Sequence, residues 1–569
     1  MKKSKKYLVA LIIALLFSIP LYSNYAAGFT VDLTYHLTRI EGIKESLQAH
    51  AFPVYIYPYV NNGFGYAAPL FYPDIFLLIP ALFYCLGVPI LLSYKIFLFI
   101  ISYFTALFAY ILFDYIFKDN KSLPIVCTLL YCFSDIRIQL TYQASTLGNV
   151  MGMTFIPLLF LSFYKFFIER KNCYFLIGLS FTLLLLSHVL SFALAVFFFG
   201  IFIIIDVIIN HFKKDRIICI LKAMVIAISL SAFFLFPMIE QMLSQEFWYS
   251  FLHSTTNKDL LMSNRFDLKT IFSGFTLDHL RNGTSNNESR YIGTHLSVGS
   301  VFAYLYLIYK KKTNKVINIL FVVLMFWLLI QLDIIPIEIL KPFYTIQFLW
   351  RIDAFLVPIA IYIIFIALSF IQNKNICVYL ILIYLTINVS LHFYTIYPKD
   401  YSTLNNYSKY SGFIESGKDE KTLSQTHNIN FYELVSGEYL PYTNSYDYFH
   451  ANTNIEFANE ESAIWDYERI GTTISFNTNY SYGDYIYMPL SWYKGYYYQE
   501  LDNEGNILYE KECTYNEYTK RVGIYMEEGE HIYKVYYKGT IVQKVSLFIS
   551  LVSFVVMVWI LLRYKRNYD

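Results

Sequence analysis

The sequence predicts a polytopic α-helical membrane protein with about twelve transmembrane helices, followed by a C-terminal extracytoplasmic domain that is β-sandwich-like. Three observations predict this class. The 569 residues are 56% hydrophobic, 20% aromatic and only 15% charged, with a mean hydropathy of +0.43, which is too apolar for a water-soluble globule of this length. Apolar runs of about 20 residues recur between charged or proline-containing breaks. Alternating stretches of strand character gather before the last apolar run.

The first helix follows the basic start MKKSKK and covers residues 7–22. No small-x-small cleavage site precedes Asn24, so we expect a retained helix rather than a removed signal peptide. Each of the other expected spans is an apolar run long enough to cross hydrocarbon. They lie at 89–117, 123–136, 150–168, 174–189, 190–209, 217–237, 296–310, 316–332, 352–371, 376–395 and 544–563.

Basic clusters between the runs predict the orientation. The segment 71–87, FYPDIFLLIPALFYCLG, is broken by prolines, and we interpret it as a re-entrant or interfacial helix rather than a crossing. All the basic loops then fall on the side of the N-terminus, as the positive-inside pattern requires. Both termini are therefore expected in the cytoplasm of a multi-pass cell-membrane protein. Cysteine labels at 60, 285 and 450 should react from outside, and a label at 312 should not.

This topology predicts three parts. Residues 1–395 form a multi-helix membrane domain, whose outer loop 24–88 carries the candidate active site. Residues 396–543 form an extracytoplasmic β-rich domain, because the turn sequences LDNEGN and MEEGEH separate period-two stretches there, namely GTTISFNTNY, GDYIYMPLSWY, RVGIYM and HIYKVYYKG. Residues 544–569 form the final helix and a basic cytoplasmic tail.

Charge and cysteine content exclude several classes. The formal net charge is +2, and no basic stripe stands apart from the short clusters between apolar runs, so no nucleic-acid partner is expected. The seven cysteines follow no metal-ligand spacing, so neither a zinc site nor a disulfide framework is predicted.

The stretch GFTVDLTYHLTRIEGIKESLQ places three ionisable residues directly after the first apolar segment. On a helix Asp32, His36 and Arg39 fall within about 60° of one another, beside an apolar stripe that includes Leu33 and Leu37. This pattern predicts an amphipathic helix in the outer interface with its ionisable edge turned to a cavity. The alternative is an interfacial helix whose charges are only solvated.

Two segments resemble a known family. VDLTYHLTRIEGIKESL, with the later FPVYIYPYVNNGFGYAAPLFYPDIFLLIPALFYCLG, is similar to the first outer loop of bacterial membrane proteins of the GT-C glycosyltransferase superfamily. The most similar branch comprises YfhO-like proteins and those related to 6-pyruvoyl-tetrahydropterin synthase. PLSWYKGYYYQELDNEG also resembles the outer β-domain that precedes their final helix.

The resemblance implies sugar transfer on the outer face of the membrane, from a polyprenyl-phosphate-linked sugar donor to an envelope glycan or lipid acceptor. Asp32 matches the position of the catalytic acid. No DD or DxD pair stands at 31–34, which argues against a metal-dependent mechanism, although a divalent cation stays open as a cofactor.

Sugar transfer needs a base for the acceptor hydroxyl and positive charge for the leaving phosphate. A partly dehydrated carboxylate gains basicity, which suits Asp32 as the base. His36 could orient Asp32 or the acceptor. Arg39 could pair with the acid or with a phosphate, and Asp74, in YPD, is a second acid near the same loop.

Three further residues are candidates for substrate binding. Arg290 and His295, in NESRYIGTH, precede a helix and form either an acceptor or head-group loop or an ordinary interfacial cap. Arg351, in FLWRIDAF, stands at the mouth of an apolar helix. It is a candidate ligand of the donor phosphate, or else an arginine that reaches lipid phosphates or pairs with Asp353.

A second class of function remains open, namely a transporter, flippase or polymer-handling protein without covalent chemistry. Such a protein is expected to carry inverted repeats and ionisable groups near the bilayer midplane. The sequence shows no repeat and few charges within its apolar runs, and it therefore favours the glycosyltransferase.

Overall fold

The computed structural model divides into two compact units, which are treated separately. The helical unit comprises Met1–Leu33, Tyr94–Ala227 and Thr255–Gly417, and the mixed unit comprises Thr34–Ser93, Ile228–Ser254 and Lys418–Asp569. The structure describes residues 2–22, 31–61, 63–210, 214–250, 292–396, 438–443, 463–481 and 483–566, together with 261, 265, 268 and 455–457.

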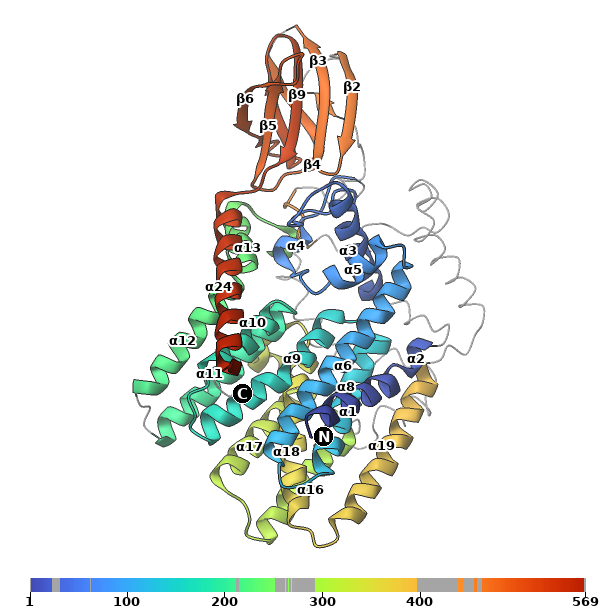
Figure 1. The fold of residues 1–569 in the computed structure, drawn as a ribbon, viewed down its shortest axis with the longest axis vertical. Coiled ribbons are helices and arrows are strands. Elements are labelled where there is room, and N and C mark those ends of the chain that lie inside the picture. Colours follow the sequence, from blue (N-terminus) through green and yellow to red (C-terminus); the bar gives the residue numbers. More distant parts are fainter. Residues whose placement is uncertain are drawn as a thin grey trace. The chain divides into compact units, whose positions relative to one another are not determined.

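The helical unit is a bundle of apolar helices (Figure 1). Its helices are α1 (Lys2–Phe17), α2 (Ile19–Tyr22), α6 (Ile90–Ile116), α7 (Leu123–Cys132), α8 (Asp135–Ile138), the π-helix η1 (Gln139–Gln143), α9 (Leu147–Phe163), the π-helix η2 (Tyr164–Ile168), α10 (Tyr174–Leu185), α11 (Val189–Asn210), α12 (Lys214–Leu230), α16 (Thr294–Tyr309), α17 (Lys315–Ile330), the 3₁₀ helices η3 (Ile337–Ile346) and η4 (Leu349–Ile352), α18 (Asp353–Ser369) and α19 (Lys374–Ile396). The central helix is α18, which is apolar on all sides and packs against α7, α9, α16, α17 and α19.

Six described stretches are long and apolar enough to cross a membrane, or up to eight if each of two broken pairs counts as one span. The six are Ile90–Ile116, Leu147–Ile168, Val189–Asn210, Leu349–Ser369, Lys374–Phe393 and Ile541–Arg563. The structure supports a membrane protein but does not confirm about twelve spans. The expected spans at 174–189, 296–310 and 316–332 correspond to helices of 12 to 16 residues, which rise at most about 24 Å against a hydrocarbon thickness of roughly 30 Å.

The mixed unit contains helices of the first outer loop, the first of which enters the unit at Thr34, and a later helix. They are α3 (Val31–Gln48), α4 (Ala68–Phe71), α5 (Leu78–Cys85) and α13 (Ala232–Ser244), and the last helix of the chain, α24 (Ile541–Arg566), belongs to the same unit. The eight residues of α5 rise only about 12 Å, so the segment 71–87 holds no membrane-crossing helix, as its prolines predicted.

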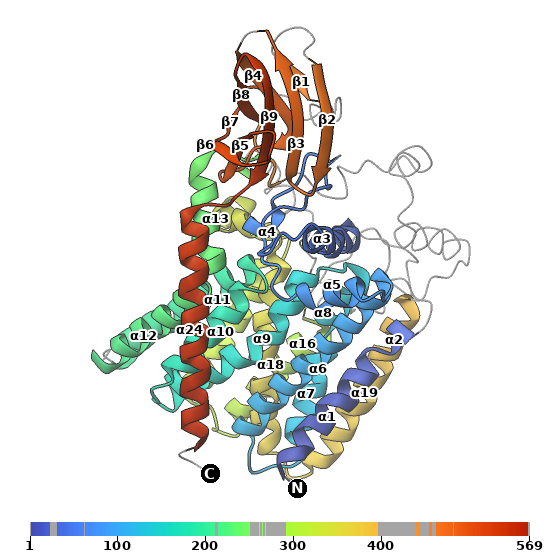
Figure 2. The same cartoon turned by 45° about the horizontal axis from the view of Figure 1, so that its top comes forward.

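The last helix runs beside α13 in both views (Figures 1 and 2). Ser550 Oγ accepts a hydrogen bond from the Phe233 amide at 3.0 Å and donates one to the Ser229 carbonyl at 3.0 Å. Near the other end of the pair, Glu240 accepts a hydrogen bond from Thr540 Oγ1 at 2.6 Å. The predicted final span is thus tied to an earlier helix by polar contacts as well as by apolar packing.

The C-terminal β-sheet domain consists of two antiparallel sheets (Figure 2). One has the order β1-β4-β8-β7 and the other β2-β3-β9-β5-β6. The strands are β1 (Glu456–Phe457), β2 (Ala463–Ile470), β3 (Thr473–Tyr480), β4 (Asp484–Ser491), β5 (Tyr496–Leu501), β6 (Ile507–Glu512), β7 (Thr514–Tyr515), β8 (Arg521–Met526) and β9 (Gly529–Tyr537). Buried side chains from both sheets form one core, for example Phe476, Met488, Ile524 and Val535, as in a β-sandwich.

Candidate functional site

Helix α3 buries its apolar stripe and part of its ionisable edge. Leu33, Leu37 and Ile40 are buried, as the period of the sequence predicted, but His36 and Arg39 are buried as well. Since an unpaired buried charge is very costly, Arg39 needs an anionic partner, which the loop before α5 supplies, and His36 contacts Arg39.

Arg39 forms a buried ion pair with Asp74. Its Nε donates to Asp74 Oδ1 at 3.0 Å, and its Nη2 donates both to the same carboxylate and to the Pro73 carbonyl, the latter at 2.9 Å. The Arg39 Nη1 atom lies 3.2 Å from His36 Nδ1. The guanidinium also lies 4.2 Å from the centre of the Tyr72 ring, a cation–π contact. Two nitrogens of the guanidinium, Nε and Nη2, therefore join α3 to Pro73 and Asp74, and the cation–π contact adds Tyr72.

Two tyrosines complete this polar set. Tyr57 Oη donates to Asp74 Oδ2, and the Tyr35 ring lies beside the Arg39 guanidinium, with 5.6 Å between its centroid and the guanidinium carbon. Burial raises the pKa of Tyr35 and of Tyr57, so both phenols stay protonated. Burial opposes the charge on Arg39, but the Asp74 carboxylate outweighs this effect and raises the pKa of Arg39 above the usual value. The set therefore holds a permanent cation beside a carboxylate.

Gly42 explains how Tyr57 reaches Asp74. A Cβ atom at this position would overlap the Tyr57 ring, with Cδ1 at only 2.6 Å. A glycine in the middle of a helix costs roughly 0.5–1 kcal/mol relative to alanine. The lower helix stability at Gly42 is offset by the close packing of the Tyr57 ring against this position of α3.

Asp32 lies in the first turn of α3 and is partly exposed. It precedes His36 by one helical turn, and an acidic residue here is favoured by the helix dipole. The predicted residues His36, Arg39 and Asp74 thus come together in one buried set, and Asp32 stands at the start of the helix that this set holds.

The helical unit contains a second buried polar set, which we name the Asp135 cluster: Asp135, His295, Asn388 and His392. Asp135 begins α8, directly after the break that follows α7, while Asn388 and His392 lie one turn apart on α19. Asn388 Nδ2 donates to Asp135 Oδ1 at 2.6 Å, and His392 Nε2 lies 3.3 Å from the same oxygen. Asp135, Asn388 and His392 are all buried.

The predicted residue His295 belongs to this cluster. Gly293 precedes α16 with φ 96°, and a Cβ atom there would overlap Asp135 Oδ2 and lie 2.8 Å from His295 Cε1. Both His295 ring nitrogens are shielded from solvent and have no hydrogen-bond partner among the described residues. Within those residues, no group of three or more His, Cys, Asp or Glu side chains has the geometry of a metal site.

Sequence reasoning did not select Asp135, Asn388 or His392. The signal was present, because each is a polar residue inside an apolar run, in CFSDIRIQL and INVSLHFY, and such residues mark functional or paired positions. Arg137 carries the same signal. It is fully buried, donates to the Cys132 carbonyl at 3.0 Å and lies 4.0 Å from the centre of the Phe17 ring.

Arg351 makes its contacts with the chain just before α18. Its Nη1 donates to the Ile346 carbonyl at 2.6 Å and to Gln347 Oε1 at 2.8 Å, and its guanidinium faces the Phe348 ring. The neighbouring Asp353 accepts a hydrogen bond from Gln331 Nε2 at 2.7 Å. Arg290, the remaining predicted substrate-binding residue, lies outside the described residues.

Comparison with known proteins assigns the chain to a family. The chain is 25% identical over 282 residues to an uncharacterized protein of Lactococcus lactis subsp. cremoris (strain MG1363), an alignment that covers 47% of this chain and 44% of the relative. The chain thus spans less than half the length of that relative. No solved structure matches the chain. Residues 66–396 match the model of the 6-pyruvoyl-tetrahydropterin synthase related domain, which is described as a membrane protein. The match covers more than half of the sequence, and the chain therefore belongs to the family of membrane proteins with a 6-pyruvoyl-tetrahydropterin synthase related domain.

Proposed function

We propose that this membrane protein is a glycosyltransferase that uses a polyprenyl-phosphate-linked sugar as donor, with Asp32 as the catalytic base. The observation that carries the proposal is the buried set of His36, Arg39 and Asp74, which fastens the helix whose first turn bears Asp32. Catalytic groups act best when the residues around them hold the supporting element rigidly.

The proposed step is a single displacement. The Asp32 carboxylate takes the proton of the acceptor hydroxyl while the oxygen of that hydroxyl attacks the anomeric carbon of the sugar. The bond from that carbon to the phosphate oxygen breaks, and polyprenyl phosphate leaves with the electron pair. A base positioned for this transfer contributes roughly 10²–10⁴-fold to the rate.

The other predicted site residues have different roles in this proposal. Arg39 and Asp74 are positioning residues, because their polar atoms already bind each other within the protein. Arg351 is the proposed ligand of the donor phosphate, since its planar guanidinium suits bidentate binding of phosphate. His36 positions α3, and Arg290 and His295 remain candidates for acceptor or head-group binding.

The test is transfer by the purified full-length protein, supplied with a panel of polyprenyl-phosphate sugars and assayed for released polyprenyl phosphate. Asp32→Asn should lower turnover by at least 10²-fold and leave the thermal midpoint almost unchanged, since a partly exposed carboxylate contributes little packing. Glu41→Gln is the matched control, because Glu41 is a carboxylate on the same helix that forms an ion pair with Lys44, at 3.5 Å. Near-normal turnover of Asp32→Asn would remove Asp32 as the base. The same assay with EDTA would decide whether a divalent cation is required.

The Asp135 cluster favours a second candidate function, proton-coupled transport. A buried carboxylate beside His392 is the kind of pair that carries protons in transporters. Proteoliposomes with a pH-sensitive dye inside would separate the two functions. Proton uptake that is lost in Asp135→Asn but kept in Asp32→Asn would favour transport, whereas sugar transfer without proton movement would favour the glycosyltransferase.

A further inference from the structure

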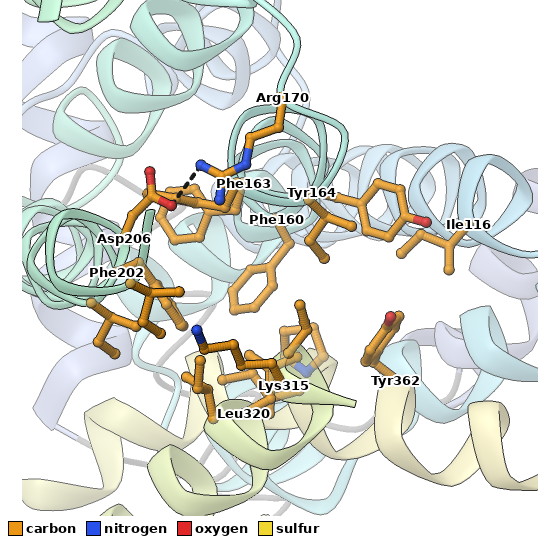
Figure 3. A pocket seen from close by; sticks show the side chains of 18 of the residues that line it. Ile116, Phe160, Phe163, Tyr164, Arg170, Phe202, Asp206, Lys315, Leu320 and Tyr362 are labelled. Atoms are coloured by element: carbon orange, nitrogen blue, oxygen red, sulfur yellow. Dashed lines mark hydrogen bonds and ion pairs between the residues drawn. The ribbon is translucent and has the colours of Figure 1, made fainter. Parts of the chain in front are cut away.

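A cavity of about 280 Å³ lies inside the helical unit, between α6, α9 with η2, α11, α17 and α18 (Figure 3). Its walls are mostly aromatic and aliphatic, with Phe160, Phe163 and Phe202 among the lining residues. Leu320 and Ile359 continue the apolar surface on the side of α17 and α18. A cavity with such walls suits a hydrocarbon chain better than a sugar or a nucleotide, since little in it can replace the hydrogen bonds of a polar ligand.

Charged side chains gather at one part of this wall. Asp206 Oδ1 accepts from Arg170 Nη1 at 2.6 Å and from Asn210 Nδ2 at 2.8 Å, while Asp206 Oδ2 lies 3.3 Å from Arg216 Nε. One carboxylate therefore positions two guanidiniums. Two positive charges against one negative charge leave this group with a net charge of +1.

Lys315 adds a further positive charge from the facing wall. It begins α17, is exposed, and forms no ion pair with any residue in the described ranges. Figure 3 shows its side chain pointing across the cavity from the α17 wall toward the side that carries Asp206 and Arg170. A cation in the first turn of a helix is disfavoured by the helix dipole, so Lys315 does not serve the stability of α17. The charged lining residues Arg170, Asp206 and Lys315 give the cavity wall a net charge of +1, and Arg216, which pairs with Asp206 but does not line the cavity, raises the net charge of the whole group to +2.

The backbone beside the cavity is irregular in two places. The helix that begins as α9 changes to the π-helix η2 over Tyr164–Ile168, and π-helical turns are frequent at functional sites. Two residues later Arg170 has φ 59°, in the left-handed region, which costs a non-glycine residue roughly 1–3 kcal/mol. This turn directs the Arg170 side chain toward Asp206.

The cavity lies where several helices reach the same end of the bundle. Its lining comes from the C-terminal turns of α6, η2 and α11 and from the N-terminal turns of α17. The loops at these ends are the basic clusters KDNK, ERKN, HFKKDR and KKKTNK, which the positive-inside pattern assigns to the cytoplasm. Basic pockets between transmembrane helices on the cytoplasmic side bind anionic lipid head groups.

We propose that this cavity binds one acyl chain of an anionic glycerophospholipid of the cytoplasmic leaflet, with Arg170 and Lys315 contacting its phosphate from opposite walls. The inference does not depend on the proposed glycosyltransferase activity. The apolar cavity supplies the site for the chain, and the net positive charge of its wall supplies selectivity for an anionic head group over a zwitterionic one.

The experiment uses full-length protein in nanodiscs of phosphatidylcholine that contain a small fraction of phosphatidylglycerol with a diazirine on one acyl chain. After illumination, cross-linked peptides are mapped by mass spectrometry, and we expect them in α9–η2 and α11. Unlabelled phosphatidylglycerol should compete, and phosphatidylcholine should not. Lys315→Gln should weaken this competition about fivefold, the effect of one basic residue near an anionic surface. Phe202→Trp, which fills the cavity, should reduce the cross-linking itself.

Lys311→Gln is the matched control, because Lys311 is an exposed lysine of the same basic cluster that does not line the cavity. Equal behaviour of Lys315→Gln and Lys311→Gln would overturn the proposal, as would equal competition by phosphatidylcholine or cross-links confined to other helices. Stronger competition by polyprenyl phosphate than by phosphatidylglycerol would overturn the assignment to a phospholipid. If Phe202→Trp fails to fold, the exposed Lys315 still decides the question.

Discussion

A guanidinium without solvent contact, such as that of Arg39, is stable only while its charge is compensated. Asp74 supplies the opposite charge, and the Pro73 carbonyl takes a further N–H group. Removing one partner of such a pair leaves an uncompensated buried charge, whereas replacing both partners by apolar residues is often nearly neutral. The stability of the protein therefore depends on whether both partners of the ion pair are present or both are absent, more than on either residue alone.

Asp74→Ala should accordingly destabilise the protein by about 3–5 kcal/mol, seen as a lower thermal midpoint of the purified full-length chain. The double variant Arg39→Met, Asp74→Ala should recover part of this loss, because no buried charge remains. Glu41→Gln, which removes a partly exposed pair worth about 0–1 kcal/mol, is the control. A double variant less stable than Asp74→Ala would show that Arg39 contributes through contacts other than the ion pair.

Substitution of Gly293 tests the packing around the Asp135 cluster. Gly293→Ala combines a left-handed backbone with a Cβ atom that overlaps Asp135. Gly87→Ala has a similar φ of 89° but no atom within 4 Å of the new Cβ, so it reports backbone strain alone, about 1–2 kcal/mol. We expect a clearly larger fall in thermal midpoint for Gly293→Ala. Equal falls would mean that Asp135 and His295 move aside freely.

Some of these residues were predictable from local sequence and others were not. The 3.6-residue period in 31–48 led to His36 and Arg39, because both lie on the same helix as the apolar stripe. Asn388 lies 253 residues after Asp135, and no local pattern connects such positions. Their contact depends on how α8 and α19 pack, which a single sequence does not reveal.

At the scale of elements, hydropathy identified apolar runs but not whether each run is one helix. The run 123–136 contains the break at Phe133 and Ser134, and the two helical stretches on either side are bent by 45°. The prolines of 71–87 did predict a broken segment. In the β-domain, alternation predicted β3, β4, β8 and β9, whereas β2 and β6, whose exposed or mixed patterns lack a clean period, were not predicted.

The pairing of β5 with β9 carries a titratable contact, His531 with Glu500 at 2.7 Å. Burial lowers the pKa of His531, but the Glu528 carbonyl and the Glu500 carboxylate outweigh it and raise the pKa above the usual value. The stabilisation of the folded protein by the His531–Glu500 contact is therefore complete below about pH 6.5, and it is lost as the pH rises through the raised pKa of His531. Between pH 6 and pH 8 the wild type should lose up to about 1 kcal/mol more than His531→Gln, measured as the difference between their thermal midpoints at each pH. Parallel changes in both proteins would exclude this contact as the cause.

At the scale of the whole molecule, the predicted orientation can be tested with a native cysteine. Cys85 is exposed, whereas the other six cysteines are buried or partly buried. A membrane-impermeant maleimide added to intact cells should label wild type and not Cys85→Ser, because the outer loop is predicted outside. In a background without Cys85, Lys312→Cys should be labelled only after the cells are opened. Labelling of Lys312→Cys in intact cells would reverse the topology and require another crossing before it.

A cysteine label at position 60, which the sequence analysis placed in the outer loop, is not suitable for this experiment. Val60 is only 5% exposed, so a cysteine at position 60 would be protected whichever side it faces. Positions 285 and 450 lie outside the described residues. Leu86, at the end of α5, is 81% exposed and provides a substitute.

The pairing of α24 with α13 has a consequence for the order of events during synthesis. Phe233 and Ser550 are 317 residues apart in the chain. At 5–20 residues per second, the ribosome needs roughly 15–60 s to make the intervening polypeptide. During that interval the face of α13 that later packs against α24 has no partner helix. A stop codon that removes only the last helix should therefore reduce the amount of protein in the cell, even though every earlier residue has been made.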